Sequence, residues 1–325
     1  MRKKLLLTVI LAGASCGVWA ASGTGDTYPN KPIRLIVGFT PGGSDDLVGR
    51  MVAARISERF GQTVIVDNRP GAGGNIGVEI TARANADGYT LSSCGSITLA
   101  SSPSLYPKLG YDPMKDFAFI SRVAIGANVL FTHPSVPVKS VAELVALARS
   151  KPKGISYGTP GVASLGHLTL EVLQSTSGMQ LIHVPYKGPA AAVTAVMGGE
   201  VQVGIGASPA VIPMIQAKRV QPLAVTSAKR MGPLPSVPTV AESGFPGFEV
   251  TNNHGILAPA RTPASIIKLL NAEVQAMLQT EAARTRLSTQ GLEVIGSTPE
   301  EFRAIVKAEL TRWTRVIKEA GIAVN

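Results

Sequence analysis

The residues best placed to do chemistry are small and polar, and they lie in a loop between an apolar run and a helical pattern. Residues 33–46, IRLIVGFTPGGSDD, contain a Pro-Gly-Gly turn at this point. Gly42 and Gly43 allow a tight turn and a close approach of the backbone to a ligand. Ser44 or Asp45 can cap the following helix, whose first N–H groups would then face the same space. The pattern predicts an anion-binding loop.

A second loop repeats these features. Residues 156–167, SYGTPGVASLGH, again place glycine, proline and small residues between a strand pattern and a helix start. Its donors would be the N–H groups of residues 161–164 and the hydroxyls of Thr159 and Ser164. His167 would lie on the first helical turn, where packing and ligand contact are both open. A small anion clamped between two domains needs two such loops.

Patterns for other chemistry are weak. The glycines of GAGGNIG lack the GxGxxG spacing, and no Walker lysine follows, so this segment is predicted to be a strand-to-helix connection with Asn75 as a helix cap. The four histidines have no metal-ligand spacing, and His183 is expected to be a partly buried strand residue. Cys94 has no neighbouring base in sequence that would make it a nucleophile. We therefore expect neither a metal nor a cofactor.

The elements that position these loops follow an α/β pattern. Short β-branched runs alternate with helical patterns, which favours parallel sheets built from βαβ units. Strands are predicted at 33–39, 63–68 and 89–94, from about 128, and at 155–159, 181–186, 201–207 and 221–227. Helices are predicted at 45–60, 75–84, 140–149, 164–176, 189–198, 209–217 and 263–279, and from 298, where Thr-Pro-Glu-Glu forms a capping box.

The strands up to residue 94 form one series and those from about residue 128 form a second. These two series predict two α/β lobes with a cleft between them. One lobe would comprise residues 28–124 plus 253–325 and the other residues 125–252. Two chain crossings, near 122–128 and 249–255, would form the hinge. Ligands of open α/β sheets lie beyond the carboxyl ends of the strands, so the loops of the two lobes should face each other.

The N-terminus predicts export. Arg2, Lys3 and Lys4 precede a short apolar run, and cleavage after Ala20 or Ala21 would remove a signal peptide of residues 1–20. A lipid attached at Cys16 is a weaker alternative. No later segment approaches the roughly 20 apolar residues of a membrane span. The net charge of +10 can steer anions, yet no dense basic run indicates nucleic acid as a partner.

The chain also resembles a known family. The motifs YPNKPIRLIVGFTPGGSDD, VIVDNRPGAGGNIGVE, YGTPGVASLGHL, HVPYKGPAAA, LAVTSAKR and VPTVAESGFPGFEV occur in this order. They resemble the tripartite tricarboxylate transporter substrate-binding receptors, the Bug family, from residue 28 to the C-terminus. The resemblance implies a periplasmic binding protein fold of type II-like architecture and a small carboxylate ligand. It also implies delivery to a two-component membrane permease, without catalysis.

The resemblance also implies the ligand-binding residues. The first lobe would contribute two sets, namely Phe39, Thr40, Pro41, Gly42, Gly43, Ser44 and Asp46, and Gly95, Ser96 and Ile97. The second lobe would contribute Thr159, Gly161, Val162, Ala163, Ser164 and His167, with Ala207 and Ser208.

Several positions depart from the family pattern. Asp45 places an extra carboxylate at the anion loop. We expect it to point outward into solvent, as acids at a helix start commonly do; alternatively it accepts a hydrogen bond from an amino or hydroxyl group of the ligand. Asn253 and His254 replace a usual aromatic pair, and Ala195 and Gly206 replace polar residues. These changes leave the ligand itself unpredicted.

Two other functions remain open from the sequence. The closed receptor could dock on the periplasmic domain of a sensor kinase, and a gene lying near a sensor gene would favour this reading over a neighbouring permease pair. A periplasmic enzyme is the third reading. Conversion of a bound compound, abolished by Cys94→Ala, would support it.

Overall fold

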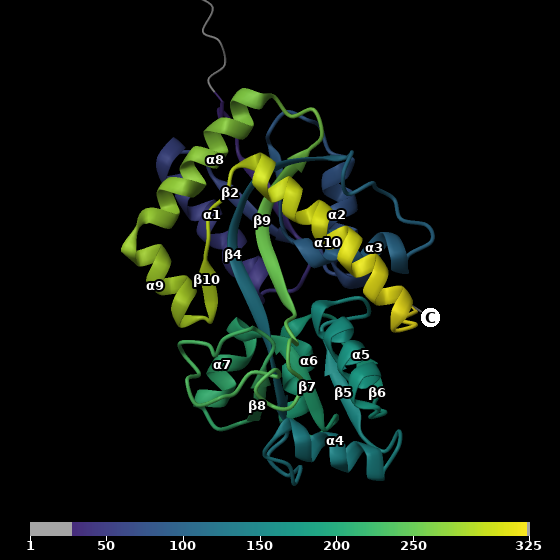
Figure 1. Cartoon of the computed structure of the whole chain (residues 1–325). Coiled ribbons are helices and arrows are strands. Elements are labelled where there is room, and N and C mark those ends of the chain that lie inside the picture. Colours follow the sequence, from purple (N-terminus) through teal and green to yellow (C-terminus); the bar gives the residue numbers. More distant parts are fainter. Residues whose placement is uncertain (1–27, 324–325) are drawn as a thin grey trace, which may run out of the picture.

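The computed structural model describes residues 28–323, which form two α/β lobes joined through one continuous sheet (Figure 1). The strand order is β2-β1-β3-β9-β4-β7-β5-β6, and β8 and β10 also pair with β4. The strands are β1 (Ile33–Val37), β2 (Val64–Asn68), β3 (Thr90–Gly95), β4 (Phe117–Thr132), β5 (Ser156–Thr159), β6 (Ile182–Pro185), β7 (Val203–Ala207), β8 (Gln221–Val225), β9 (Thr251–Pro259) and β10 (Leu292–Val294). The predicted signal peptide, residues 1–20, lies outside the described residues.

Helices cover both faces of the sheet in each lobe. They are α1 (Ser44–Phe60), the short 3-10 helix η1 (Ala72–Gly74), α2 (Asn75–Ala82), α3 (Ser96–Leu105), α4 (Val141–Ser150), α5 (Leu165–Ser177), α6 (Pro189–Met197), α7 (Ser208–Gln216), α8 (Ala264–Gln279), α9 (Glu281–Thr289) and α10 (Pro299–Glu319). In the larger lobe, α1, α8 and α9 pack on one face and α2, α3 and α10 on the other. In the smaller lobe, α4 and α5 lie opposite α6 and α7.

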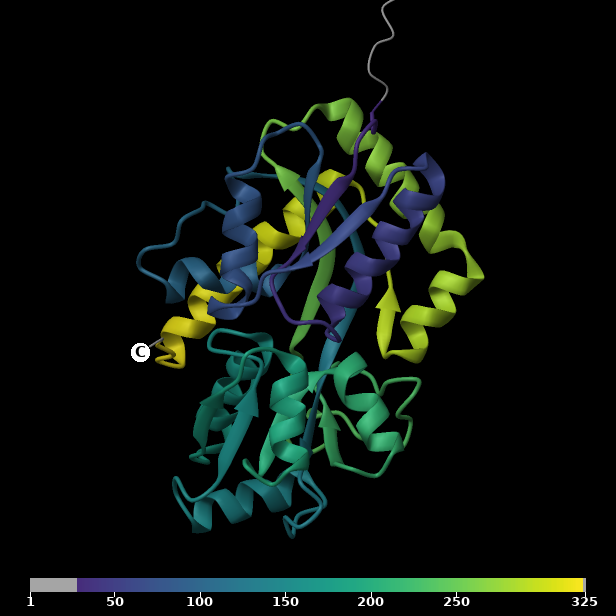
Figure 2. The same ribbon diagram turned by 180° about the vertical axis from the view of Figure 1, so that it is seen from behind.

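Alternation along the strands explains these layers, because successive side chains point to opposite faces of a sheet. In β9, Ile256 packs with α1 and α8, whereas the neighbouring Leu257 packs with α2 and α10. In β4, Leu130 and Phe131 divide in the same way between the two helical layers of the smaller lobe. Figure 2 shows the purple and blue strands of the larger lobe from behind, above the teal smaller lobe.

Strand β4 passes through both lobes. Its residues 117–127 pair with β9, whereas residues 128–132 pair with β7 and β8. The chain returns where the Val250 N–H donates to the carbonyl of Thr226 and then enters β9. This arrangement supports crossings near 122–128 and 249–255; the lobe boundaries at 124/125 and 252/253 stay a prediction.

The structure contains the predicted strands and helices, but their ends differ from the predicted ones. Strand β4 begins 11 residues before the expected start near Asn128, and the helical C-terminal part also contains β9 and β10. Helix α3, SITLASSPSL, was not expected. Most of its Ser and Thr side chains are buried alongside its apolar ones, so the segment has no apolar stripe of helical period.

Two predicted caps are wrong. Gly43 is the N-cap of α1 and Gly74 that of α2, and neither helix has a side-chain cap. Asn75 instead donates to the carbonyl of Ala72 and accepts from the hydroxyl of Tyr111. The capping box at Thr298 and Glu301 is confirmed.

Candidate functional site

A cavity of about 60 Å³ lies between the two lobes. Space of this kind holds a few water molecules or a small polar group, since one water needs about 10–15 Å³. Both lobes and both crossings supply its walls. The lining residues are Phe39, Gly43, Ser44, Asp45, Ile97, Gly126, Ala127, Asn128, Pro160, Ser164, Leu165, Gly166, Pro189, Ala207, Asn252 and His254.

Five helices begin at this cavity. Lining residues stand at the first positions of α1, α3, α5, α6 and α7, namely Ser44, Ile97, Leu165, Pro189 and the N-cap Ala207. The first N–H groups of a helix lack intrahelical partners and carry a partial positive charge. Two of these starts contribute their dipole without a free N–H at the lining residue: Pro189 has no N–H, and the Ile97 N–H donates to Asn252 Oδ1. No lysine or arginine is among the lining residues, all of which belong to the described chain. The cavity therefore attracts an anion through backbone dipoles.

The hydroxyl of Ser44 adds a side-chain donor. Ser44 is 4% exposed, and its Oγ has no hydrogen-bond partner among the described residues. A buried hydroxyl without a partner is unfavourable and usually satisfied by a bound molecule. Because Ser44 lines the cavity, a ligand is the natural partner.

Asp46 supports the first loop from behind and does not line the cavity. Its carboxylate accepts from the Gly42 N–H at 3.1 Å, from Arg50 Nε at 2.9 Å and from Asn68 Nδ2 at 3.0 Å. Burial opposes ionisation, but these hydrogen bonds outweigh it and lower the pKa of Asp46 below its usual value. Asp46 therefore holds the loop, and a ligand contact of its own stays a prediction.

The expectation that Asp45 points into solvent is wrong. Asp45 is 6% exposed, lines the cavity, and its Oδ1 lies 2.6 Å from Nδ1 of His254, which is 5% exposed. Asp45 turns inward because His254 on β9 offers it a buried hydrogen-bond donor. The two residues are 209 positions apart, so the sequence alone does not reveal this contact. Asp45 and His254, which both depart from the family pattern, are therefore in direct contact.

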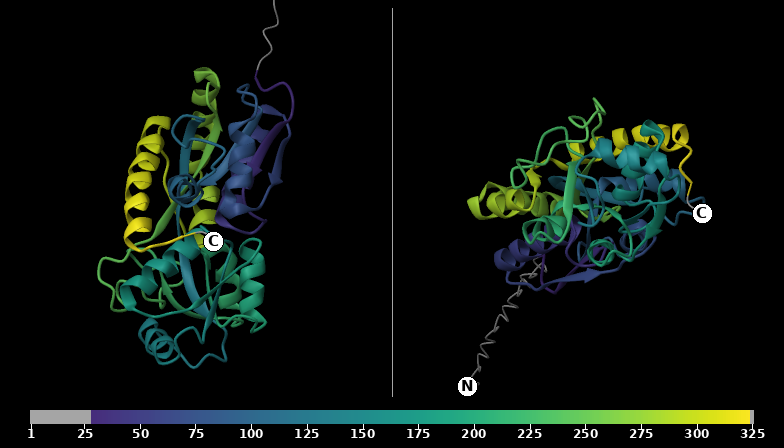
Figure 3. Two further views of the ribbon diagram at one scale, coloured as in Figure 1. Left: turned by 90° about the vertical axis from the view of Figure 1, so that its right-hand side faces the viewer. Right: turned by 90° about the horizontal axis from the view of Figure 1, so that it is seen from below.

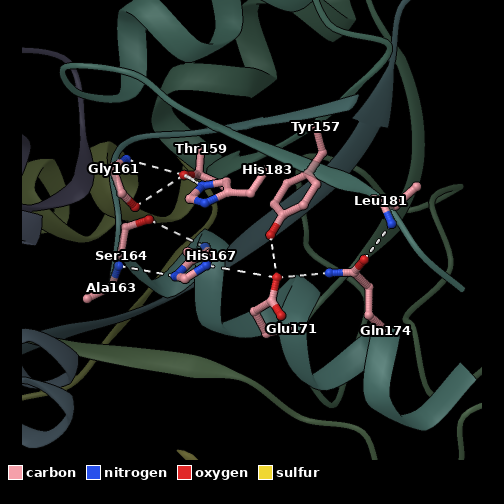
Figure 4. Close-up of polar contacts among 10 residues, drawn as sticks. All are labelled: Tyr157, Thr159, Gly161, Ala163, Ser164, His167, Glu171, Gln174, Leu181 and His183. Atoms are coloured by element: carbon pink, nitrogen blue, oxygen red, sulfur yellow. Dashed lines mark hydrogen bonds and ion pairs between the residues drawn. The ribbon is translucent and has the colours of Figure 1, made fainter. Parts of the chain in front are cut away.

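The second loop, residues 159–164, is held by a buried polar cluster (Figure 4). Ser164 is the N-cap of α5 and accepts from the His167 N–H. His167 Nδ1 accepts from the Ala163 N–H at 3.2 Å, and Thr159 Oγ1 lies 2.7 Å from His183 Nε2. Gly161 and Ala163 have positive φ angles of 141° and 61°. His167 therefore supports the loop instead of facing the cavity.

The two imidazoles of this cluster are stacked, with ring centroids 4.1 Å apart. Burial, and to a lesser extent the neighbouring His167, lowers the pKa of His183 to about 3. Burial also lowers the pKa of His167, although the Glu171 carboxylate opposes this. Both rings are consequently neutral at physiological pH, which leaves His167 Nδ1 free to accept.

The structure brings six of the predicted ligand residues to the cavity: Phe39, Gly43, Ser44, Ile97, Ser164 and Ala207. The others do not line it, namely Thr40, Pro41, Gly42, Asp46, Gly95, Ser96, Thr159, Gly161, Val162, Ala163, His167 and Ser208. Ser208, for example, donates to the carbonyl of Gln290 at 2.8 Å and so joins the two lobes. Loops supply both lining and supporting residues, and the sequence does not separate them.

Asn128 and Asn252 are lining residues that sequence reasoning missed. The Asn252 Oδ1 accepts from the Ile97 N–H at 3.0 Å and from Ser96 Oγ at 3.2 Å, and its Nδ2 has no partner within residues 28–323. Both asparagines are buried and lie at the crossings. The signal available in the sequence was the presence of asparagines at the two predicted hinge crossings.

The lobes touch around the cavity. A Cβ on Gly43 would lie 3.1 Å from Pro189 Cγ, and one on Gly73 would lie 2.6 Å from the carbonyl oxygen of Val162. An apolar cluster, which includes Ile97, Leu165 and Trp313, also joins α3 and α10 to α5. Figure 3 shows the end of α10 reaching the smaller lobe. This is a closed arrangement.

The sequence comparison decides the family. The model for the tripartite tricarboxylate transporter family receptor matches residues 48–322. The chain belongs to this receptor family. The BugT protein of Bordetella pertussis is 36% identical over 319 residues, covering 98% of each chain.

Solved structures of family receptors are also similar. The Rhodopseudomonas palustris protein Rpa4515 with adipate has 38% identity and a TM-score of 0.88, covering 91% of this chain and 100% of its own. MatC of the same organism, with bound malate, has 28% identity and a TM-score of 0.85, covering 89% and 100%. The predicted family and the two-lobed solute-binding fold are confirmed.

Cys94 lies in the core of this receptor fold. It is 4% exposed, and burial, together with the charge of Asp45, raises the pKa of its thiol well above the usual value. The thiolate is the nucleophilic form of cysteine. Cys94 therefore lacks the features of a catalytic nucleophile.

Within residues 28–323, no helix has the length and apolarity needed to cross a bilayer. In the same residues no group of three or more His, Cys, Asp or Glu side chains is arranged to hold a metal ion.

Proposed function

We propose that this chain is a periplasmic receptor that binds a small carboxylate between its two lobes and delivers it to the permease of a tripartite tricarboxylate transporter. The observation that carries the proposal is the convergence of five helix starts and the unpartnered Ser44 hydroxyl on one interlobe cavity. Relatives with adipate and malate support a carboxylate ligand.

In this proposal the ligand itself brings the lobes together. Ser44 and the start of α1 belong to the larger lobe, and Ser164 and the start of α5 to the smaller. A carboxylate bound by both loops favours the closed state, because only that state offers donors from both sides. The hinge would comprise the crossings at 122–128 and 249–255.

A charge placed at the second loop tests the proposal. Ser164→Asp keeps a good helix cap, since aspartate caps as well as serine, but adds an anion beside the cavity. We expect a loss of carboxylate affinity of at least about a hundredfold by calorimetric titration, because like charges at close range cost several kcal/mol. Ser140→Asp, at the corresponding cap of α4, is the matched control and should bind normally. Unchanged affinity in Ser164→Asp would contradict the site.

Export and delivery need separate tests. We expect the mature protein in the periplasmic fraction, beginning at residue 21 or 22, and a permease pair encoded beside the gene. Deletion of that permease should abolish uptake of the ligand while the receptor still binds it. Uptake that continues without the permease would contradict delivery.

A further inference from the structure

The cavity contains one ionisable pair. Among its lining residues only Asp45 and His254 carry ionisable side chains, and both are more than nine-tenths buried. Their Oδ1 and Nδ1 atoms are 2.6 Å apart. A carboxylate accepts hydrogen bonds, so Nδ1 carries the proton of this contact. The pair thus places a carboxylate in the wall of a cavity built for anions.

Each partner retains one atom without a protein partner. Within residues 28–323, no group hydrogen bonds to Asp45 Oδ2 or to His254 Nε2. His254 Nε2 faces Gly126 of the cavity wall, since a Cβ there would lie only 2.7 Å from it. A carboxylate oxygen without a donor becomes costly once a bound ligand excludes water from it. The ligand is the group positioned to supply one.

The donor must lie close to the ligand's own carboxylate. Ser44, the unpartnered hydroxyl that donates toward an anion, immediately precedes Asp45, and both line the same small cavity. Because this cavity holds only about 60 Å³, a carboxylate near Ser44 and a donor near Asp45 must lie close together on one small ligand. A substituent on the carbon next to the carboxylate fits this spacing.

We propose that Asp45 and His254 select carboxylates bearing a hydroxyl or ammonium group on the neighbouring carbon, and disfavour unsubstituted acids. This inference rests on the proposed function and names the ligand class of the same site. An unsubstituted acid leaves Asp45 Oδ2 unpaired and adds its negative charge beside that oxygen. A site built to bind a hydroxyl discriminates strongly against the analogue that lacks it.

Calorimetric titration of the wild-type receptor with matched pairs tests the inference. The pairs are 2-hydroxy or 2-amino acids and their unsubstituted counterparts, for example malate and succinate. We expect the tightest-binding substituted acid to exceed its counterpart by at least about tenfold. Asp45→Asn keeps the size of the side chain and removes its charge, and should reduce this ratio toward one while unsubstituted acids bind at least as well as before.

Asp46→Asn is the matched control. Asp46 supports the loop without lining the cavity, so its replacement should weaken both members of a pair by the same factor and keep their ratio. Thermal unfolding of each variant checks that it folds.

The outcomes separate the two proposals. Equal binding of both members of every pair, or a ratio that persists in Asp45→Asn, overturns the selection by Asp45 and leaves carboxylate binding intact. Absence of binding by any carboxylate, with none retained by the purified protein, overturns both.

Discussion

Two consecutive aspartates in the first turn of α1 have different surroundings. Asp46 accepts from Gly42, Arg50 and Asn68 and holds the loop, whereas Asp45 turns to the cavity and His254. Their positions differ by one residue, about 100° of helix rotation, which places one side chain behind the loop and one in front of it. The loop and its tight Pro-Gly-Gly turn are predictable from the sequence. The direction of Asp45 is not, because its partner comes from β9.

The hydroxyl of Ser44 gives a direct prediction at this scale. Ser44→Ala should weaken carboxylate binding by about 10- to 150-fold, the worth of a hydrogen bond to a charged group. Ser92→Ala is the matched control: Ser92 Oγ is equally buried and unpartnered, but Ser92 does not line the cavity. Titration of both variants should therefore separate them, and equal affinities would exclude Ser44 as a ligand donor.

Cys94 gives a second prediction. Because burial and the charge of Asp45 raise its thiol pKa, little thiolate should exist at pH 8. We expect peptide mapping to find Cys94 unmodified after the native protein is treated with a thiol reagent at pH 8, and modified when the protein is unfolded in urea. Rapid labelling of the native protein would contradict the assigned burial.

At the scale of elements, the site depends on where helices start. Most strands and helices are predictable from β-branched runs, caps and apolar periodicity, and the capping box at Thr298 is confirmed. Helix α3 and the sharing of β4 between two lobes are not predictable in this way. They depend on burial of both faces and on pairing between segments distant in sequence.

The second loop predicts a dependence of stability on pH. His183 has a pKa of about 3 in the folded protein, against about 6.5 when unfolded. Between these values the unfolded chain binds a proton that the folded chain does not, so this contribution is complete above pH 6.5 and declines as the pH falls toward 3. His183→Gln, which can keep a hydrogen bond to Thr159, should lose less stability than wild type between pH 7 and pH 5.

Urea unfolding at both pH values measures this difference. Equal losses in His183→Gln and wild type would show that another group causes the acid sensitivity.

At the scale of the whole molecule, the proposed function makes binding and closure one event. The lobes meet at the Gly43–Pro189 and Gly73–Val162 approaches and in the apolar cluster of α3, α5 and α10. The two lobes and their crossings follow from the order of strands in the sequence. The closed contacts do not, because each joins segments that are distant in the sequence.

A wedge at the contact between the lobes should therefore reduce binding. Gly43 has φ −91° and ψ 177°, which any residue can adopt, and its missing Cβ faces Pro189. Gly43→Leu should hold the lobes apart, abolish the ligand-induced decrease in radius of gyration, and weaken affinity by at least about tenfold. Gly232→Leu, at an exposed position with no neighbour within 4 Å, is the control. Normal compaction of Gly43→Leu in X-ray scattering would contradict the closed contact.

Native mass spectrometry of the receptor purified from the periplasm can show whether the interlobe cavity holds a carboxylate. We expect one small carboxylic acid per chain, released on denaturation and reduced in amount by Ser164→Asp but not by Ser140→Asp. A retained compound without a carboxylate, or a carboxylate retained equally by Ser164→Asp, would contradict the assignment of the interlobe cavity as a carboxylate site.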